Sequence, residues 1–244
     1  MPNFRAFFLL ILGVWATSGC SAIMYYPGPH HAPVPKETGE VRAGGYASSI
    51  GNFAAQASIS PLPHVFTHGM IQTARIDDEI FRMGEAGLGV YHNFDDATPY
   101  DNNVTLSLLG TWGRGTSSGD GGGGLIRQYT VDTRLERLAA QFDTGVWINL
   151  SDKIPGDTFV TTSMRLSHIR LYDIVLNGSS PMPEQTGIFL EPGAKAGIDF
   201  GFVRSYGTFG FTVPMTMFDD TRFSYEPVSL GFGISFDISH PFRE

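Results

Sequence analysis

The sequence predicts an all-β fold, an up-and-down antiparallel transmembrane β-barrel of about ten strands, with eight or twelve strands as alternatives. Three observations predict it. Apolar residues alternate with small or polar residues from residue 39 onward, which is the period of a strand and not of a helix. Several alternating segments exceed the roughly five or six residues of a globular strand. Only 16% of the 244 residues are charged, against roughly a quarter in soluble domains, and 30 residues are glycine.

The segment 228–238 shows the alternation most clearly. Successive side chains of a strand point to opposite faces, so one face of this strand is apolar and the other is small or polar. In a membrane barrel the apolar face contacts lipid and the small face lines the lumen. In a soluble β-sandwich, the alternative interpretation, the polar face meets water. The apolar face carries Val228, Leu230, Phe232, Ile234, Phe236 and Ile238.

The same pattern predicts the whole strand order. An even number of strands is typical of single-chain bacterial barrels. If both ends of the barrel domain are periplasmic, the two longest connections, 114–133 and 173–186, face outward, as barrel topology requires. Pro192 predicts a bulge, because proline cannot donate to the ladder. We expect strands at 39–48, 51–60, 64–76, 81–92, 102–113, 136–149, 156–172, 188–200, 205–217 and 228–238.

Aromatic residues near the predicted strand ends indicate interfacial girdles, since amphipathic rings prefer the level of the lipid headgroups. The alternative is that these rings form the core of a soluble sandwich. We expect Trp112, Tyr46, Tyr172 and Tyr225 at the outer rim, and Tyr91, Trp147 and Tyr206 at the inner rim.

The amino terminus predicts export and lipidation. Residues 1–19 have the basic residue and short apolar run of a signal peptide, and the run is too short to span a membrane as a helix. Small residues then precede Cys20, the only cysteine in the chain. They resemble a bacterial lipobox, in which the cysteine carries the lipid. Residues 20–38 are Pro-rich and predict an extended, lipidated tether, followed by the barrel domain at 39–244.

Charged residues at inward positions predict the content of the lumen. Four positive and five negative groups nearly cancel, and buried charges must be paired. We therefore expect a salt-bridge network that fills a narrow barrel; the alternative is a narrow path for ions or small solutes. The predicted network consists of Arg42, Glu85, Arg137, Asp143, Arg165, Glu191, Lys195, Asp199 and Asp237.

Other function classes lack support in the sequence. A formal net charge of −8 argues against a nucleic-acid partner. Neither a metal site nor a cofactor is expected. An outer-membrane lipid hydrolase would need a Ser–His pair on one face. The neighbours Ser167 and His168 point to opposite faces of a strand, so we expect no catalytic residues.

Four short stretches suggest a family. CSAIMYYP, VPKETGEVRAGGY, LLGTWGRG and YEPVSLGFGISF resemble a family of small, uncharacterised outer-membrane β-barrel lipoproteins of bacteroidete-type bacteria. The resemblance implies a lipid on Cys20, a barrel in the bacterial outer membrane and no known reaction. The expected partners are outer-membrane lipids and, for a structural or envelope-interaction role, other envelope proteins.

Overall fold

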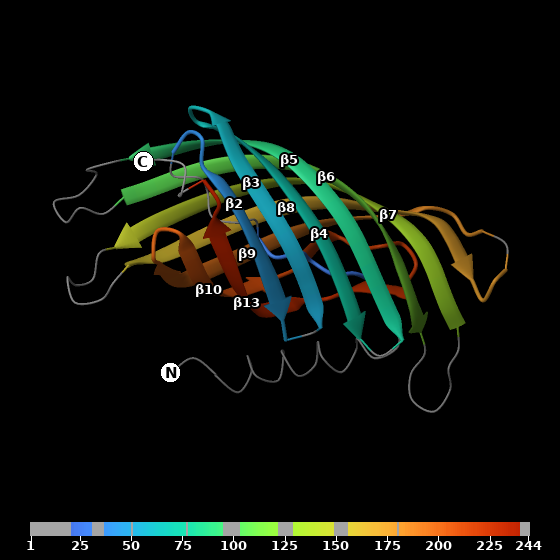
Figure 1. Ribbon diagram of the computed structural model, residues 1–244. Coiled ribbons are helices and arrows are strands. Elements are labelled where there is room, and N and C mark those ends of the chain that lie inside the picture. Colours follow the sequence, from blue (N-terminus) through green and yellow to red (C-terminus); the bar gives the residue numbers. More distant parts are fainter. Residues whose placement is uncertain are drawn as a thin grey trace, which may run out of the picture.

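Ten antiparallel strands close into one barrel within the described part of the computed structural model (Figure 1). Each strand pairs with its neighbour in sequence, and β13 closes the ring between β10 and β2. The structure describes residues 21–30, 37–49, 51–76, 78–94, 103–121, 129–148, 156–179 and 181–239. The ring consists of β2 (Val41–Ser48), β3 (Asn52–Leu62), β4 (Val65–Ile76), β5 (Glu79–Phe94), β6 (Asn103–Gly121), β7 (Tyr129–Ile148), β8 (Asp157–Leu176), β9 (Gln185–Asp199), β10 (Val203–Phe211) and β13 (Val228–Asp237).

This arrangement confirms the predicted up-and-down barrel of ten strands and their order. Three short strands accompany the ring: β1 (Ala22–Tyr25), β11 (Val213–Thr216) and β12 (Phe223–Tyr225). β11 continues the line of β10 along β9. β9 pairs with β10 as far as Gly210 and with β11 from Val213. The pairing is interrupted at Phe211 and Thr212, opposite the stretch of β9 that contains Pro192. The interruption therefore lies in the strand that pairs with Pro192, whereas Pro192 itself stays in register with Met164 of β8.

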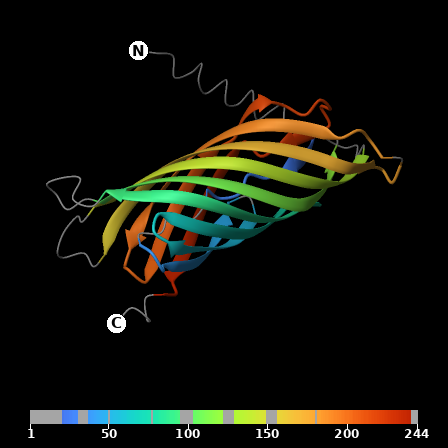
Figure 2. The same cartoon turned by 90° about the horizontal axis from the view of Figure 1, so that it is seen from above.

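The strands differ greatly in length. β7 and β8 have 20 residues each and β2 has 8, so the wall is much taller at β6–β8 (Figure 2). The prediction of a long loop at 114–133 is wrong, because β6 and β7 pair as far as Gly121 and Tyr129. Likewise, β8 extends to Leu176 and β9 begins at Gln185, so the connection predicted at 173–186 is only 177–184. The lengths of the connections therefore do not support the orientation in which both ends of the barrel domain are periplasmic.

The Gly- and Ser-rich stretch of β6 forms strand for a tertiary reason. Its inward positions must be small because β1 lies against them: a Cβ at Gly119 would meet the Met24 methyl group at 3.3 Å. The apolar Val131 and Leu135 of β7 complete this part of the interior, and both are fully buried. Packing inside the barrel thus overrides the low strand propensity of glycine.

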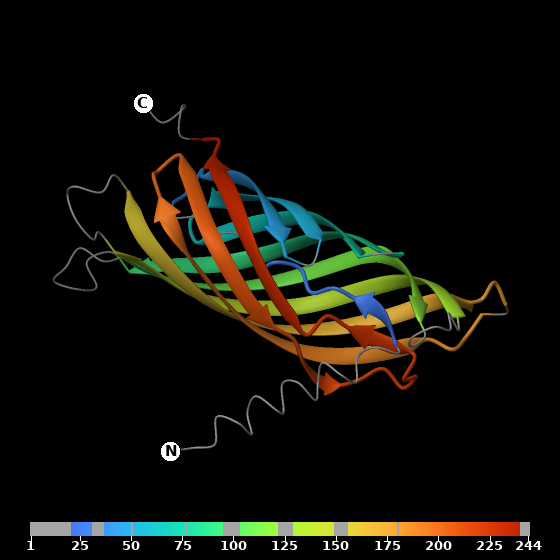
Figure 3. The ribbon, with the colours of Figure 1, turned by 90° about the horizontal axis from the view of Figure 1, so that it is seen from below.

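We name the two ends of the barrel by what they contain. The plug end holds the β4–β5 turn together with β1 and β12. The termini end is where β2 begins and β13 ends. Residues 21–30, which we call the plug, run inside the barrel from the plug end toward its middle (Figure 3).

Candidate functional site

The plug contradicts the predicted extended tether over its described part. Residues 22 and 24–30 are buried, and β1 pairs in parallel with β12, of which Phe223 is also buried. The apolar residues of the sequence AIMYY, read as part of a linker, are instead core residues. Cys20 and residues 1–19, predicted as lipidation site and signal peptide, lie outside the described residues, as do residues 31–36.

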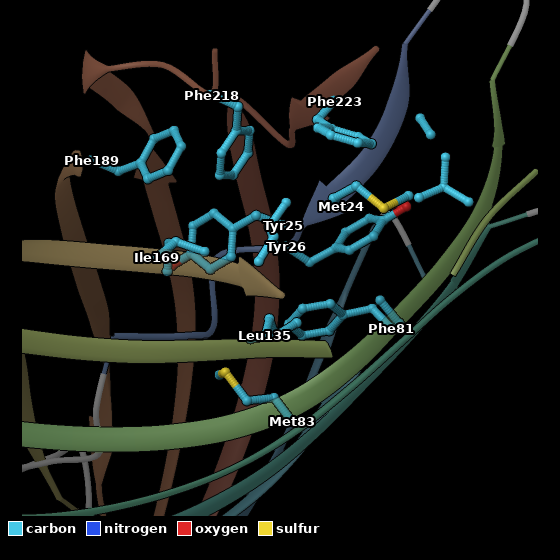
Figure 4. Packing of buried hydrophobic residues seen from close by; sticks show 14 of the residues in the cluster. Met24, Tyr25, Tyr26, Phe81, Met83, Leu135, Ile169, Phe189, Phe218 and Phe223 are labelled. Carbon is cyan, nitrogen blue, oxygen red and sulfur yellow. The ribbon is translucent and has the colours of Figure 1, made fainter. Parts of the chain in front are cut away.

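An apolar core surrounds β1 at the plug end (Figure 4). Met24, Tyr25 and Tyr26 point from the plug into side chains of the tall wall and of the segment around β12. The Tyr25 ring lies 5.4 Å from that of Phe189, and the Tyr26 ring lies 5.5 Å from that of Phe81. Besides these residues, the core includes Met83, Val131, Leu135, Ile169, Leu171, Ile174, Phe218 and Phe223.

The backbone of the plug is held by polar side chains of the wall. Arg165 Nη2 donates to the Gly28 carbonyl at 2.8 Å, and Arg165 Nη1 donates to the Pro29 carbonyl at 3.3 Å. Gln72 Nε2 donates to the Tyr26 carbonyl at 3.2 Å. These bonds matter because a segment with two prolines has few N–H groups with which to join a sheet. The wall therefore satisfies the carbonyl oxygens of the plug with side chains.

Two buried ion pairs meet at the plug. Arg137 pairs with Glu85, and Arg165 pairs with Glu191. Tyr25 joins them, because its hydroxyl donates to Glu191 Oε1 at 2.6 Å and accepts from Arg137 Nη1 at 3.2 Å. The network thus connects β5, β7, β8 and β9 across the interior through one plug side chain.

A second charged cluster lies at the termini end. Arg42 pairs with Glu40 and lies 3.7 Å from Asp237. Arg204 pairs with Asp199 at 2.7 Å and lies 3.8 Å from Glu40. Glu40 and Arg204 are absent from the predicted network. Glu40 shares the parity of Arg42, so the alternation is enough to place it inside. Arg204 lies outside the predicted strand 205–217, because β10 begins two residues earlier, at Val203.

The last two predicted residues lie between the clusters. Asp143 accepts from Gln141 Nε2 at 2.8 Å and from Ser107 Oγ at 3.1 Å. Lys195 lies with Nζ 5.7 Å from the centre of the Tyr206 ring. All nine predicted network residues are buried in the barrel interior, none more than 8% exposed.

Most of the predicted girdle rings face inward instead. Tyr46 and Tyr206 have the parity of inward residues, and each ring lies over a glycine of β13. A Cβ at Gly231 would meet the Tyr46 ring at 2.4 Å, and one at Gly233 would meet the Tyr206 ring at 2.3 Å. The four rings found inside are Tyr46, Tyr91, Trp147 and Tyr206, all at most 5% exposed.

The outer face carries the large apolar side chains. On β7, Leu138 and Phe142 are 59% and 47% exposed, while the inward Arg137 is fully buried. The predicted outer-rim residue Trp112 is also on this face, and its Nε1 donates to Glu136 at 2.7 Å. Exposed apolar side chains occur from β3 round to β13, among them Phe53, Ile71, Leu88, Leu108, Met164, Phe209, Phe232 and Phe236.

Both faces of the tall wall change polarity at the same level. On β7, counted from the plug end, the outer residues are polar as far as Glu136 and apolar or Thr from Leu138 onward. The inner residues are apolar apart from Thr133 as far as Leu135, and the next inner residue, Arg137, is charged. On β8 and β5 the same change occurs. The inner face passes from Ile169 to Arg165, and from Met83 to Glu85. On these three strands, therefore, the plug half is apolar inside and polar outside, whereas beyond this level charged residues face inward and apolar residues face outward.

Acidic groups near the plug end have individual roles. Glu79 accepts from Ile23 N at 3.2 Å and from the Tyr26 hydroxyl. Arg222 donates to Asp220 and holds the pKa of that carboxyl below its usual value. Burial, with the charge of Glu79 adding to it, raises the pKa of Glu226 from 4.5 to about 7.

Within the described ranges there is no group of three or more His, Cys, Asp and Glu side chains that could hold a metal ion. The same part of the chain contains no helix long and apolar enough to cross a membrane. Ser167 is fully buried while His168 is exposed, so these neighbours lie on opposite faces, as predicted.

The chain matches no family model, no curated protein and no solved structure. What the structure supports is therefore the ten-stranded barrel itself, with a buried salt-bridge network inside.

Proposed function

We propose that this chain is an outer-membrane β-barrel lipoprotein whose own amino-terminal segment closes the lumen, and that its role is structural or envelope-interacting. The coincident change of polarity on the two faces carries the proposal. An exposed apolar face of this extent marks a membrane or protein surface. Buried charge on the inner side of the same strands is typical of a barrel in lipid.

The height of the apolar face supports a bilayer as its environment. On β7 the outward residues are apolar or Thr from Leu138 to Ile148, a stretch of 11 residues by position. A tilted transmembrane strand needs roughly 9 to 11 residues. Trp112 pairs with Leu138 at the boundary, which is where interfacial tryptophan is enriched. The plug half of β6–β8 then extends beyond the bilayer.

The contacts of the plug favour a closed lumen rather than an open channel. A permanent path requires space along the axis, whereas the plug fills the interior with an apolar core and with bonds to Arg165 and Gln72. Charges below the plug are paired between neighbouring strands, as at Arg204 of β10 and Asp199 of β9. Such pairs stabilise the interior only while both partners are present.

The position of Ser21 supports a lipid anchor at the plug end. Ser21 Oγ donates to the Thr221 carbonyl at 2.7 Å, so the chain meets this end of the barrel directly after Cys20. A lipid on Cys20 enters the leaflet on this side. If the termini end is periplasmic, that leaflet is the outer one.

Two measurements test the membrane and the closed lumen separately. A barrel folded in lipid resists SDS until it is boiled, so an unshifted band after heating of the membrane fraction contradicts the membrane proposal. In planar bilayers we expect no steady openings from the purified protein and openings from a variant that lacks residues 21–30. Steady openings of the intact protein would favour the narrow channel instead.

The anchor and the non-catalytic role have their own tests. Cys20→Ala should abolish fatty-acid labelling of the mature chain; retained labelling contradicts lipidation at this residue. Lipid hydrolase activity that disappears on substitution of a single histidine, such as His168, would overturn the structural role.

A further inference from the structure

A groove lies on the outer face of the shorter wall, from β2 to β6. It consists of two adjoining depressions with volumes of about 770 and 690 Å³, which share Ala55, Ile71 and Gly84. Phe53 borders the first depression and Trp112 the second. Apart from Ile71, the outward residues between them are small, so the surface is hollow there while large apolar side chains border it.

Two arginines lie at the plug end of this groove. Arg82 and Arg114 both line the first depression. Arg82 is opposite Thr116, and Arg114 is opposite Gly84, so the two arginines are diagonal neighbours on adjacent strands. Diagonal neighbours are about 7–8 Å apart at Cα, which lets two long side chains reach one anion.

The two arginines of the groove differ from the neighbouring arginines in how their charges are paired. Arg170 pairs with Glu184 at 2.7 Å and Arg134 with Asp173 at 3.3 Å. Among the described residues Arg82 has no carboxylate partner, whereas Arg114 pairs with Glu136 at 3.5 Å, and Glu136 is shared with Arg170 at 3.6 Å. Arg82 and Arg114 together therefore carry more positive charge than this one shared carboxylate neutralises.

The level of the two arginines matches a lipid headgroup. Arg114 pairs with Glu136 of β7, the last polar residue before the apolar face begins at Leu138. A lipid in that position has its phosphate at the arginines and its acyl chain along the apolar groove, across Gly84, Ile71 and Ala55, which are in register with Arg114. Arginine is well suited to phosphate because its planar fork donates two parallel hydrogen bonds.

We propose that this groove binds one anionic, phosphate-bearing membrane lipid, with the phosphate between Arg82 and Arg114 and an acyl chain over Ala55, Ile71 and Gly84. The inference rests on the proposed membrane location and adds a specific ligand to it. The occupant is a lipid and not a free anion, since the arginines open onto an apolar groove.

Native mass spectrometry of the full-length barrel in mild detergent tests this site. The probe is phosphatidylglycerol, and the comparison lipid is phosphatidylcholine with the same acyl chains. We expect one retained phosphatidylglycerol per barrel and at least tenfold weaker retention in the double variant Arg82→Gln/Arg114→Gln. The matched control, Arg134→Gln/Arg170→Gln, removes the same charge outside the groove and should retain the lipid.

A second variant tests the groove itself. A Cβ at Gly84 meets no atom within 4 Å, so Gly84→Leu fills the groove without a clash in the wall and should also weaken retention. Equal retention of both lipids, or loss in the control variant as large as in the Arg82/Arg114 variant, overturns the proposal. Displacement by inorganic phosphate alone at the same concentration would show a simple anion site and also overturn it.

Heat-modifiable mobility of each variant separates the two proposals. If all variants shift on heating but none distinguishes the lipids, the lipid site fails and the membrane barrel stands. If the unmodified protein itself does not shift, the membrane location fails, and the lipid site fails with it.

Discussion

On β5, β7 and β8 the two halves of the barrel carry apolar and charged residues on opposite faces. The plug half has apolar residues inside, around Tyr25 and Leu135, and charged residues outside, such as Arg134 and Glu136. The termini half of β7 has Asp143 inside and Phe142 outside. The same strands pass through both halves without a break in pairing.

This difference teaches that strand pairing does not determine which face is apolar. The alternation of period two supplies two faces, and the surroundings of each half decide which residues those faces carry. In water, burial of apolar area is the main stabilising contribution, about 25 cal/mol per Å². In a bilayer, lipid accepts the apolar face, and the interior can hold charges that pair with one another. The four predictions below test this comparison.

The largest expected effect is at the ion pair beneath the plug. Arg137→Met leaves Glu85 buried without its partner, and loss of one partner of a buried pair costs about 3–5 kcal/mol. It also removes the hydrogen bond from Arg137 to the Tyr25 hydroxyl. Urea unfolding in lipid vesicles, followed by tryptophan fluorescence, measures the change in free energy.

The double variant Arg137→Met/Glu85→Leu is the matched control. Removal of both charges takes away the desolvation cost together with the attraction, so we expect it to recover most of the loss. If the double variant is as unstable as the single one, charge pairing is not what stabilises this level of the barrel.

The next effect concerns the apolar core of the plug half. Leu135 is fully buried in that core, and Leu→Ala in a core costs about 2–5 kcal/mol. Leu138 lies three residues along on the outer face and is 59% exposed, so Leu138→Ala should cost about 1 kcal/mol. The same unfolding measurement compares them. Equal losses would contradict the assignment of a separate core to the plug half.

A charge on the outer face distinguishes the two halves directly. Phe142→Arg places a charge within the apolar face of the termini half, where arginine in a barrel costs about 2–4 kcal/mol near the bilayer midplane. Thr130→Arg makes the change on the outer face of the plug half of the same strand, where we expect less than about 0.5 kcal/mol. Folding yield into vesicles measures both. A tolerated Phe142→Arg would mean that no lipid contacts this face.

The alternation of period two was sufficient to predict the barrel, its ten strands and the inward set of charges. It works because a shift by one residue would turn every side chain of a strand to the opposite face. Arg137 and Leu138 show this: their assignment to opposite faces needs no knowledge of their partners. The same argument predicts that Glu40 faces inward, because it has the parity of Arg42.

The burial of the plug could not be predicted from the sequence, for a physical reason. Its contacts are with residues far along the chain, 46 positions away between Tyr26 and Gln72 and 137 between Gly28 and Arg165. Its prolines are equally common in linkers. The extension of β6 to Gly121 depends in turn on β1 lying against it. Local propensity at GRGTSSGDG favours a loop, and only the filled interior stabilises it as a strand.

The smallest expected effect is a pH dependence confined to the plug half. Glu226 N donates to the Tyr25 carbonyl at 3.0 Å, and the pKa of Glu226 is raised from 4.5 to about 7, chiefly by burial. The folded state therefore holds a proton between these values that the unfolded state has lost. Stability from this group is fully present below about pH 4.5 and decreases as the pH rises toward 7.

With allowance for the partial exposure of Glu226, the loss is about 1 kcal/mol. Glu226→Gln should remove this part of the slope between pH 4.5 and 7, because the amide does not titrate. Glu184→Gln, a change of the same kind at an exposed carboxylate, should leave it in place. The measurement is the urea midpoint as a function of pH. An unchanged slope in Glu226→Gln would mean that this carboxyl is solvated at the mouth of the barrel, and that the apolar environment of the plug half ends below Tyr25.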